Sequence, residues 1–333
     1  MEYRIETRGY RRRLSQPLDT ADGPWTVRDG IVVRLTDADG RVGYGEVAPL
    51  RRAGCESIVR ARKALRNLGE RTTDELMDGL PRDLPCCRFA LISARWMITE
   101  PALEYTFANC ALLPAAERAI LGLERAVDSG YRCFKLKIGV IDAETEQAVV
   151  DQLLDGLPPE GRLRLDANGS LDAARTRMWL EFLKGRAGVD FLEQPLPSGE
   201  EETAAEIANE FQTQLALDES VSATGQLVTL VSARMWKGPI IFKPLLIGDP
   251  LALPRMLGPL NNRMVVSSVF ETGFGIHNAL RVADAVGVND AAGFGTLSFF
   301  DDGLGGFPAG PELSSEDMGA ARLAELWDKL TSR

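Results

Sequence analysis

Short apolar runs in the middle of the chain each end in a charged residue, and they recur at nearly even intervals. The terminal charges are Lys137, Asp166, Glu193, Asp218 and Lys243, which follow one another every 25 to 29 residues. A strand with its crossover helix and loops occupies about 30 residues, and strands joined in this way are parallel. Since the C-terminal ends of parallel strands meet at one edge, the spacing predicts that the charges converge.

The same alternation extends beyond this series in both directions and predicts eight strands. We expect them at 107–112, 132–138, 162–166, 189–193, 214–218, 239–243, 263–268 and 292–298. Helical patterns fill the gaps, as at 115–129, 143–154 and 173–184. So many strands with connections close to the minimum for parallel crossovers favour an α/β fold, a closed TIM-type barrel or a close variant of it. A doubly wound open sheet is the alternative.

Residues 1–104 lack this alternation, because strand patterns are followed there by helical ones. We expect strands at 3–14, 31–36 and 41–46, helices at 51–68 and 84–98, and a short helix from residue 73. This succession indicates a compact α+β domain, followed by a barrel over 105–305. The segment 306–333 contains a helical pattern at 314–332, which we expect to pack back on the first domain.

The composition excludes several classes of partner. The chain has 333 residues and a formal net charge of −10, which argues against binding nucleic acid or anionic membranes. We find no run of about 18 apolar residues that would span a membrane, and no apolar core of a secretion signal at the N-terminus. We therefore expect a cytoplasmic protein; the sequence does not indicate its oligomeric state.

Cysteine and histidine contribute little to the expected chemistry. The cysteines lack metal-ligand spacing, and we expect them to be buried, reduced thiols. They are Cys55, Cys86, Cys87, Cys110 and Cys133. The one histidine, His277, falls where a helix should begin, so we interpret it as structural. With a single histidine in the chain, Ser–His catalysis, Cys–His catalysis and multi-histidine metal sites are disfavoured.

The converging charges are suited to metal-assisted acid–base chemistry. Asp166, Glu193 and Asp218 would come from consecutive strands, and three carboxylates at one height repel each other unless a cation lies among them. Oxygen ligands without histidine or thiolate favour Mg²⁺. Lys137 and Lys243 flank the carboxylates and suit a general base, since nearby positive charge favours the neutral form of a lysine. A set of structural ion pairs at the strand ends is the alternative.

Five motifs at these strand ends resemble the enolase superfamily, in the muconate lactonizing enzyme subgroup. They are KLK at 135–137, LDANG at 165–169, EQPL at 193–196, LDES at 217–220 and FKP at 242–244. The resemblance covers essentially the whole chain and includes GYGEVAPL at 43–50. It implies a (β/α)7β barrel under an α+β capping domain built from residues 1–104 and the C-terminal segment. The cap loop at 18–28 is then expected to close over the site.

The resemblance also implies a role for each residue of the site. Mg²⁺, which Mn²⁺ could replace, would be held by Asp166, Glu193 and Asp218. Lys137 and Lys243 would face each other across a small-molecule carboxylate substrate. The remaining assignments are Lys135, Ser267, Ser268 and Gly295 for substrate binding, and Arg164, Asn168 and Glu219 for orienting the ligands. A serine pair at a strand end is also a common helix cap.

Within the superfamily, the short chain, the compact cap and the RDG sequence at 28–30 are most similar to the o-succinylbenzoate synthase family. The similarity implies a syn-dehydration that proceeds through a metal-stabilised enediolate and belongs to menaquinone or phylloquinone synthesis. A racemase of N-acylamino acids and a dipeptide epimerase are the alternatives. Epimerases of the subgroup space two aspartates one residue apart near strand eight, whereas Asp301 and Asp302 are adjacent. A Schiff-base aldolase is a more distant alternative that leaves the carboxylates unexplained.

Overall fold

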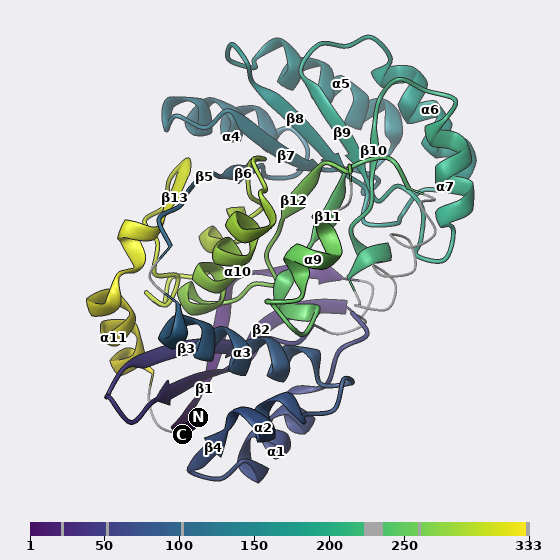
Figure 1. Ribbon diagram of the computed structural model, residues 1–333. Coiled ribbons are helices and arrows are strands. Elements are labelled where there is room, and N and C mark those ends of the chain that lie inside the picture. The colour runs from purple at the N-terminus through teal and green to yellow at the C-terminus, as the bar shows by residue number, and fades with distance from the viewer. Residues whose placement is uncertain (21–22, 51–52, 101–102, 223–235, 259–260, 331–333) are drawn as a thin grey trace.

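A four-stranded antiparallel sheet forms the lower part of the molecule in Figure 1, with strand order β3-β2-β1-β4. The computed structural model describes residues 1–333 except 21–22, 51–52, 101–102, 223–235, 259–260 and 331–333. The strands of this sheet, here called the cap sheet, are β1 (Glu2–Thr20), β2 (Gly23–Thr36), β3 (Val42–Val47) and β4 (Arg71–Thr73). The strands expected in the first domain are confirmed, and β4 was not predicted.

The first two strands are longer than predicted. A cap loop was expected at 18–28, but β1 continues to Thr20 and pairs with β2 from Thr20↔Gly23 onward, so most of this segment is strand. The pairing register shifts between Arg13 and Leu18. Pro17 lies in this irregular stretch, where a residue without an N–H group is tolerated. Ala21 and Asp22, also in the expected loop, lie outside the described residues.

Three helices follow the cap sheet. They are α1 (Ile58–Asn67), α2 (Asp74–Asp78) and α3 (Pro85–Thr99). The helix predicted from residue 51 begins seven residues later, because the Ser57 side chain accepts a hydrogen bond from the Arg60 N–H and caps α1 there. Arg51 and Arg52 lie outside the described residues.

Two glycines let α3 lie directly against β3. Gly43 and Gly45 share one face of the strand, and a Cβ atom on them would lie 1.9 Å from the Ala94 carbonyl oxygen and 1.8 Å from that of Ala90. No side chain fits into such a contact. The alternating glycines of the GYGEVAPL motif therefore set the distance between the cap sheet and α3.

We expect Gly45→Ala to lower the free energy of unfolding by about 3 kcal/mol, because α3 must move away from β3. Gly310→Ala is the matched control, since a Cβ atom there meets nothing within 4 Å. Urea unfolding followed by circular dichroism measures both variants. Equal stability of the two would contradict the close approach of α3.

A parallel barrel forms the upper part of the molecule (Figure 1). Five strands pair in the order β10-β9-β8-β7-β6, and β11 pairs with β12. The bounds are β6 (Cys110–Leu112), β7 (Cys133–Lys137), β8 (Arg162–Asp166), β9 (Val189–Glu193), β10 (Leu215–Ala216), β11 (Ile240–Phe242) and β12 (Met264–Val266). A parallel bridge between Leu217 and Ile240 joins the two groups.

The eighth predicted strand, at 292–298, is wrong in its extent. Only Ala292 and Gly293 pair, with Asn109 and Ser267 respectively, and these two bridges close the barrel. From Gly295 the chain instead turns into a 3-10 helix, η3 (Gly295–Phe299). The barrel thus closes on a two-residue segment rather than on a full strand.

The first predicted barrel strand, 107–112, divides in two at Asn109. Its first part, β5 (Thr106–Ala108), pairs in antiparallel fashion with β13 (Glu312–Ser314), and only β6 enters the barrel. The other helices are α4 (Arg118–Asp128), α5 (Ala143–Asp155), α6 (Ala173–Leu183), α7 (Glu201–Ala208), α9 (Leu253–Leu257), α10 (Gly273–Val286) and α11 (Ala320–Lys329). Short 3-10 helices lie at η1 (Glu219–Val221), η2 (Pro244–Leu246) and η4 (Ser315–Met318). Among the described helices, none has the length and apolarity of a membrane span.

The C-terminal helix α11 packs on the cap sheet. The Trp327 ring of α11 contacts two guanidinium groups of the sheet, with Arg8 4.4 Å and Arg34 4.7 Å from its centroid. Arg8 also donates a hydrogen bond of 3.1 Å to the Leu330 carbonyl. The predicted helix at 314–332 is shorter, because β13 and η4 occupy its first residues, and its last residues lie outside the described part.

Glu46 of the cap sheet joins the cap to the barrel. Its carboxylate, fully buried, accepts hydrogen bonds from the N–H groups of Thr272 at 3.0 Å and Gly275 at 2.9 Å. These groups open α10, whose first N–H groups have no partner within the helix. The carboxylate therefore caps a barrel helix from the cap sheet, and Tyr10 donates a further hydrogen bond to it.

His277 lies inside α10 in a buried position. Its Nδ1 lies 2.7 Å from the Tyr105 hydroxyl, and burial together with the charge of Arg281 lowers its pKa from 6.5 to about 3. The structural interpretation of this residue fits these contacts.

We expect the buried His277 to make stability depend on pH. Below pH 6.5 the unfolded chain binds a proton that the folded chain does not, so stability is complete above pH 6.5 and falls as the pH drops toward 3. The slope is about 1.4 kcal/mol per pH unit, or about 2 kcal/mol between pH 6.5 and 5. Urea unfolding of the wild type and of His277→Asn measures it. Parallel stability curves for the two proteins would contradict the assignment.

Candidate active site

Three of the predicted site residues form one row across the barrel. Lys137 is opposite Asp166 in the β7–β8 register, and Asp166 is opposite Glu193 in the β8–β9 register. Each is the last residue of its strand. The sequence prediction that these charges lie at one height is therefore confirmed, and they lie at the C-terminal end of the barrel.

Asp218 and Lys243 continue this edge on the next strands. Asp218 comes two residues after β10, and Lys243 follows β11 directly. Their side chains form an ion pair, with 7% and 11% of the side-chain surface exposed. The five predicted charges thus lie around one mouth. Lys137 is exposed, and its side chain makes no hydrogen bond or ion pair with the described residues.

Lys135 lies among the carboxylates. Its Nζ is 2.7 Å from both Asp166 Oδ2 and Glu193 Oε1. Burial opposes its charge, but Asp166 and then Glu193 raise the pKa of Lys135 well above 10.5. Burial raises the pKa of Glu193 to about 8, and Asp166 adds to this although Lys135 lowers it. Lys135 therefore neutralises the carboxylates, a contact that the predicted substrate-binding role did not include.

The donor set fits a hard divalent cation. Asp166, Glu193 and Asp218 expose 8%, 2% and 7% of their side chains, and buried carboxylates need compensating positive charge. Lys135 and Lys243 supply that charge in the described arrangement. The carboxylate oxygens of these three residues do not all lie within 4.8 Å of one another. Binding a metal would therefore require these side chains to move closer together.

Arg164 does not lie beside the predicted ligands. Its guanidinium donates to Asp190 at 2.9 Å and to Asp290 at 3.0 Å, and Arg263 donates to the same two carboxylates. Residues two apart on a strand share a face but differ in height by about 7 Å, so Arg164 lies one layer below Asp166. The predicted orienting contact is absent there, and Arg164 belongs to an ion network at the opposite end of the barrel.

Asn168 and Glu219 lie near the predicted ligands. The Asn168 N–H donates to Asp166 Oδ1 at 2.9 Å, and its side-chain amide donates to Glu219 Oε1 at 3.3 Å. Asn168 has a φ of 44°, which brings its N–H back toward the strand end. The two residues connect the loop after β8 to the loop after β10.

Gln194 is a site residue that the sequence analysis overlooked. Its Oε1 accepts from the Asp218 N–H at 2.9 Å, and its Nε2 donates to Ser220 Oγ at 2.9 Å. The side chain is 2% exposed and spans from the end of β9 to the loop that carries Asp218. Its place directly after Glu193 in the EQPL motif was the available signal.

The predicted substrate-binding serines differ in their surroundings. Ser268 donates to Glu271 Oε2 at 2.6 Å and lies 2.7 Å from the Thr296 hydroxyl, so its hydroxyl is engaged within the protein. Burial raises the pKa of Glu271 to about 7. Ser267 pairs with Gly293 and is half-buried. Gly295 begins η3, where a Cβ atom would lie 2.8 Å from the Cys110 carbonyl oxygen.

The β1–β2 hairpin extends from the cap sheet to the loops of the barrel mouth. Trp25 packs edge-on against Phe270 with ring centroids 4.9 Å apart, and Phe270 lies 5.8 Å from Phe299. Arg12 forms a two-pronged ion pair with Asp302 at 2.7 and 3.0 Å. The cap therefore contacts the loops after β12 and around η3, on the side of the barrel that carries the charges.

Comparison with known proteins identifies the family of this chain. Residues 118–237 match the family described as Enolase C-terminal domain-like. The o-succinylbenzoate synthase of Thermosynechococcus vestitus is 37% identical over 273 residues, which cover 80% of this chain and 84% of that protein. The chain belongs to the o-succinylbenzoate synthase family. Another o-succinylbenzoate synthase, from Proteus mirabilis, is 28% identical over 91% of this chain and 92% of its own length.

Solved structures agree with this assignment to the o-succinylbenzoate synthase family. The structure of the Thermosynechococcus elongatus enzyme, with Mg in its active site, has a TM-score of 0.86 and 32% identity, covering 98% of this chain and all of that one. The L-Ala-D/L-Glu epimerase of Bacillus subtilis has a TM-score of 0.79 at 20% identity, which shows a shared fold. The predicted superfamily, α/β fold and family resemblance are confirmed.

Proposed function

We propose that the protein is an o-succinylbenzoate synthase that dehydrates 2-succinyl-6-hydroxy-2,4-cyclohexadiene-1-carboxylate to 2-succinylbenzoate. The observation that carries the proposal is the row of Lys137, Asp166 and Glu193 at the barrel mouth, in a chain 37% identical to a member of that family. The reaction is a lyase step, and its product would serve menaquinone or phylloquinone synthesis.

The first chemical requirement is removal of a weakly acidic proton. The proton lies on the carbon beside the ring carboxylate, and its loss places a second negative charge on that carboxylate. Lys137 is the lysine at the mouth whose side chain has no ion-pair partner among the described residues, so no carboxylate holds its Nζ away from the substrate, and we assign it the role of general base. The same Nζ then returns a proton to the hydroxyl that leaves from the same face as water, and the lysine regains its neutral form.

Lys243 supplies positive charge on the other side of the mouth. Although burial opposes it, Asp218 raises the pKa of Lys243, so the group stays charged. A charged ammonium stabilises the negative charge that develops on the substrate without itself transferring a proton. The two lysines thus have different proposed roles, which their different surroundings support.

We propose Asp166, Glu193 and Asp218 as the ligands of Mg²⁺, with Mn²⁺ as a substitute. A bound Mg²⁺ supplies positive charge to the substrate carboxylate and orients it. The donor set of three buried carboxylates supports this choice, since hard oxygen ligands suit Mg²⁺. Gln194 and Asn168 would hold Asp218 and Asp166 in position through the hydrogen bonds described above.

The surroundings of Asp302 weigh against a dipeptide epimerase. Its carboxylate is paired with the buried Arg12 and also accepts from the Leu304 N–H at 3.0 Å. It is therefore engaged within the protein and does not offer a free carboxylate to a substrate ammonium. Lys243 is likewise paired with Asp218, which disfavours the neutral amine that a Schiff-base aldolase requires.

The proposed domain division is 1–104 for the cap, 105–305 for the barrel and 306–333 for the segment that returns to the cap. The packing of α11 on β1 and β2 supports it. We also propose that the protein works in the cytoplasm. Its five cysteines are all free thiols, which fits a reducing compartment.

The test is dehydration of the cyclohexadiene carboxylate, followed by ultraviolet absorbance. We expect turnover with Mg²⁺, loss of turnover in EDTA and recovery when Mg²⁺ is restored. No turnover by folded, Mg²⁺-loaded protein would overturn the proposal. Exchange of the α-proton of N-acylamino acids or dipeptides in deuterated water would then identify a racemase or epimerase.

A further inference from the structure

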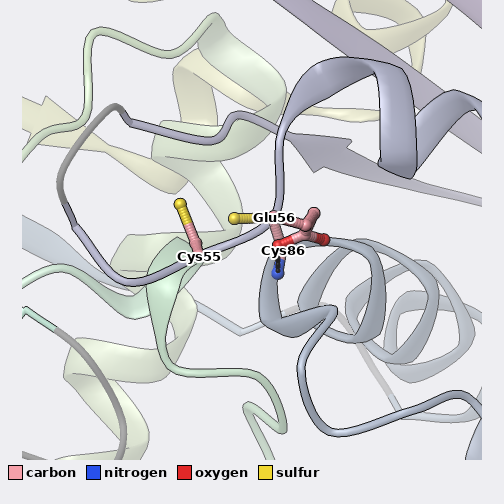
Figure 2. A group of neighbouring side chains, drawn as sticks. All are labelled: Cys55, Glu56 and Cys86. Carbon is pink, nitrogen blue, oxygen red and sulfur yellow. Dashed lines mark hydrogen bonds between the residues drawn. The ribbon is translucent and has the colours of Figure 1, made fainter.

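Two cysteine thiols and a carboxylate meet where the cap strand β3 connects to the helices. Cys55 lies in the segment between β3 and α1, and Cys86 lies in the first turn of α3. One sulfur from each and one oxygen of Glu56 all lie within 4.8 Å of one another. Figure 2 shows the two sulfur atoms next to each other, with no covalent bond between them. This cluster belongs to no part of the proposed catalytic site.

Hydrogen bonds fix the backbone around both thiols. The Glu56 carboxylate accepts from the Cys86 N–H at 3.1 Å and the Cys87 N–H at 2.8 Å, and so caps α3. Cys55 Sγ donates to the Leu50 carbonyl at 3.2 Å. Because Glu56 directly follows Cys55, the same capping contact holds the two sulfur atoms close together.

The two thiols differ in exposure and acidity. Cys55 is partly exposed, whereas Cys86 is fully buried. A hydrogen bond from Cys86 lowers the pKa of Cys55 below 9.0, although burial opposes this. Burial, followed by the hydrogen bond to Cys55, raises the pKa of Cys86. Cys55 is therefore the more reactive thiolate, and Cys86 is a second thiol held beside it.

We propose that Cys55 and Cys86 form a site of reversible oxidation by hydroperoxides, which ends in a disulfide between them. The Cys55 thiolate attacks the peroxide oxygen and becomes a sulfenic acid, while the peroxide is reduced to hydroxide or an alkoxide. The Cys86 thiol then displaces water from the sulfenic sulfur, and the S–S bond forms. The pair loses two electrons, the peroxide gains them, and a cellular dithiol reverses the step.

A second thiol pair provides an internal comparison. Cys110 and Cys133 are directly opposite in the β6–β7 register, and both are 3% exposed. If proximity alone decided, this pair would be oxidised too. If solvent access also matters, this pair should stay reduced. Cys87 is the neighbour of Cys86 in α3 and is fully buried. The proposal therefore requires that oxidation select Cys55 with Cys86 and leave the other three thiols reduced.

The test treats the intact protein with hydrogen peroxide, blocks the remaining thiols with N-ethylmaleimide and maps tryptic peptides by mass spectrometry. We expect residues 53–60 linked to residues 83–88 with loss of two hydrogens, and return of both peptides after dithiothreitol. Cys55→Ser and Cys86→Ala should abolish the link. Cys87→Ala is the matched control, because it lies in the same peptide and the same helix, and should retain the link.

Three results would overturn the proposal. One is five free thiols in the folded protein after peroxide treatment, and another is oxidation of Cys55 alone to sulfinic acid. The third is binding of one equivalent of Zn²⁺, added alone, that protects both Cys55 and Cys86 from N-ethylmaleimide. That result would make the cluster a metal site. The readout is mass rather than activity, so it does not depend on the proposed dehydration.

Discussion

Lys137→Ala is expected to lower the rate of dehydration roughly 100- to 10,000-fold, which is the usual contribution of a positioned general base. The change should leave the free energy of unfolding within about 0.5 kcal/mol of the wild type, since the side chain is exposed and has no described partner. Steady-state kinetics and urea unfolding of the same preparation measure both quantities. The combination separates a catalytic lysine from a structural ion cage.

Arginine substitutions test the different roles of the two lysines. Arginine keeps the charge but does not release its proton at working pH, so Lys137→Arg should be as inactive as Lys137→Ala. Lys243→Arg keeps the charge beside Asp218 and should retain more activity than Lys243→Ala. Lys184→Ala is the control, because this exposed lysine pairs with Glu181 on the surface of α6. Full activity of Lys137→Arg would disprove proton transfer by Lys137.

The sequence predicts the barrel and the row of charges because both follow from local periodicity. Each βα unit repeats at a nearly constant interval, so Asp166 and Glu193 end their strands in register, as expected. The motifs at the strand ends carry the family resemblance for the same reason. The chemistry takes place at the strand ends, and the positions of these ends can be predicted from a single sequence.

What the sequence does not predict depends on contacts between distant segments. Residues 292–298 have a strand pattern, but Gly295 must lie against the Cys110 carbonyl, and the chain turns into η3. Arg164 shares a face with Asp166, yet the acidic partners Asp190 and Asp290 hold it in the layer below. The partners of Arg164 come from other segments of the chain, so they are not apparent from the sequence of β8 alone.

The long β1–β2 hairpin is a third case. A cap loop was expected at 18–28, but a loop and a hairpin end contain the same turn-forming residue types. The pairing of Leu18 with Trp25 decides between them, and this pairing is a property of the folded sheet. The consequence is functional, because the extended hairpin places Trp25 against Phe270 at the barrel mouth.

Substitutions at the two ends of β9 should separate effects on Mg²⁺ affinity from effects on the free energy of unfolding. Glu193 ends the strand at the mouth and contacts Lys135, whereas Asp190 lies at the other end and pairs with Arg164 and Arg263. In such barrels the C-terminal ends of the strands carry the chemistry and the N-terminal ends contribute stability. Substitution of Glu193 should therefore affect metal binding, whereas substitution of Asp190 on the same strand should affect stability.

Glu193→Gln is expected to reduce Mg²⁺ affinity by a factor of 10 to 100 or more and turnover by roughly 100-fold, since it removes one charge from the donor set. Stability without metal should not fall, because burial of the carboxylate is unfavourable and Lys135 keeps Asp166 as a partner.

Asp190→Asn should show the reverse, with unchanged Mg²⁺ affinity and a free energy of unfolding about 3 kcal/mol lower, because it leaves the buried Arg164 guanidinium and the partly exposed Arg263 guanidinium short of a partner. Titration calorimetry with Mg²⁺ and urea unfolding in EDTA measure both variants. If Glu193→Gln bound Mg²⁺ as tightly as the wild type, Glu193 could not be a ligand, and its burial at the mouth would have to be explained by its ion pair with Lys135.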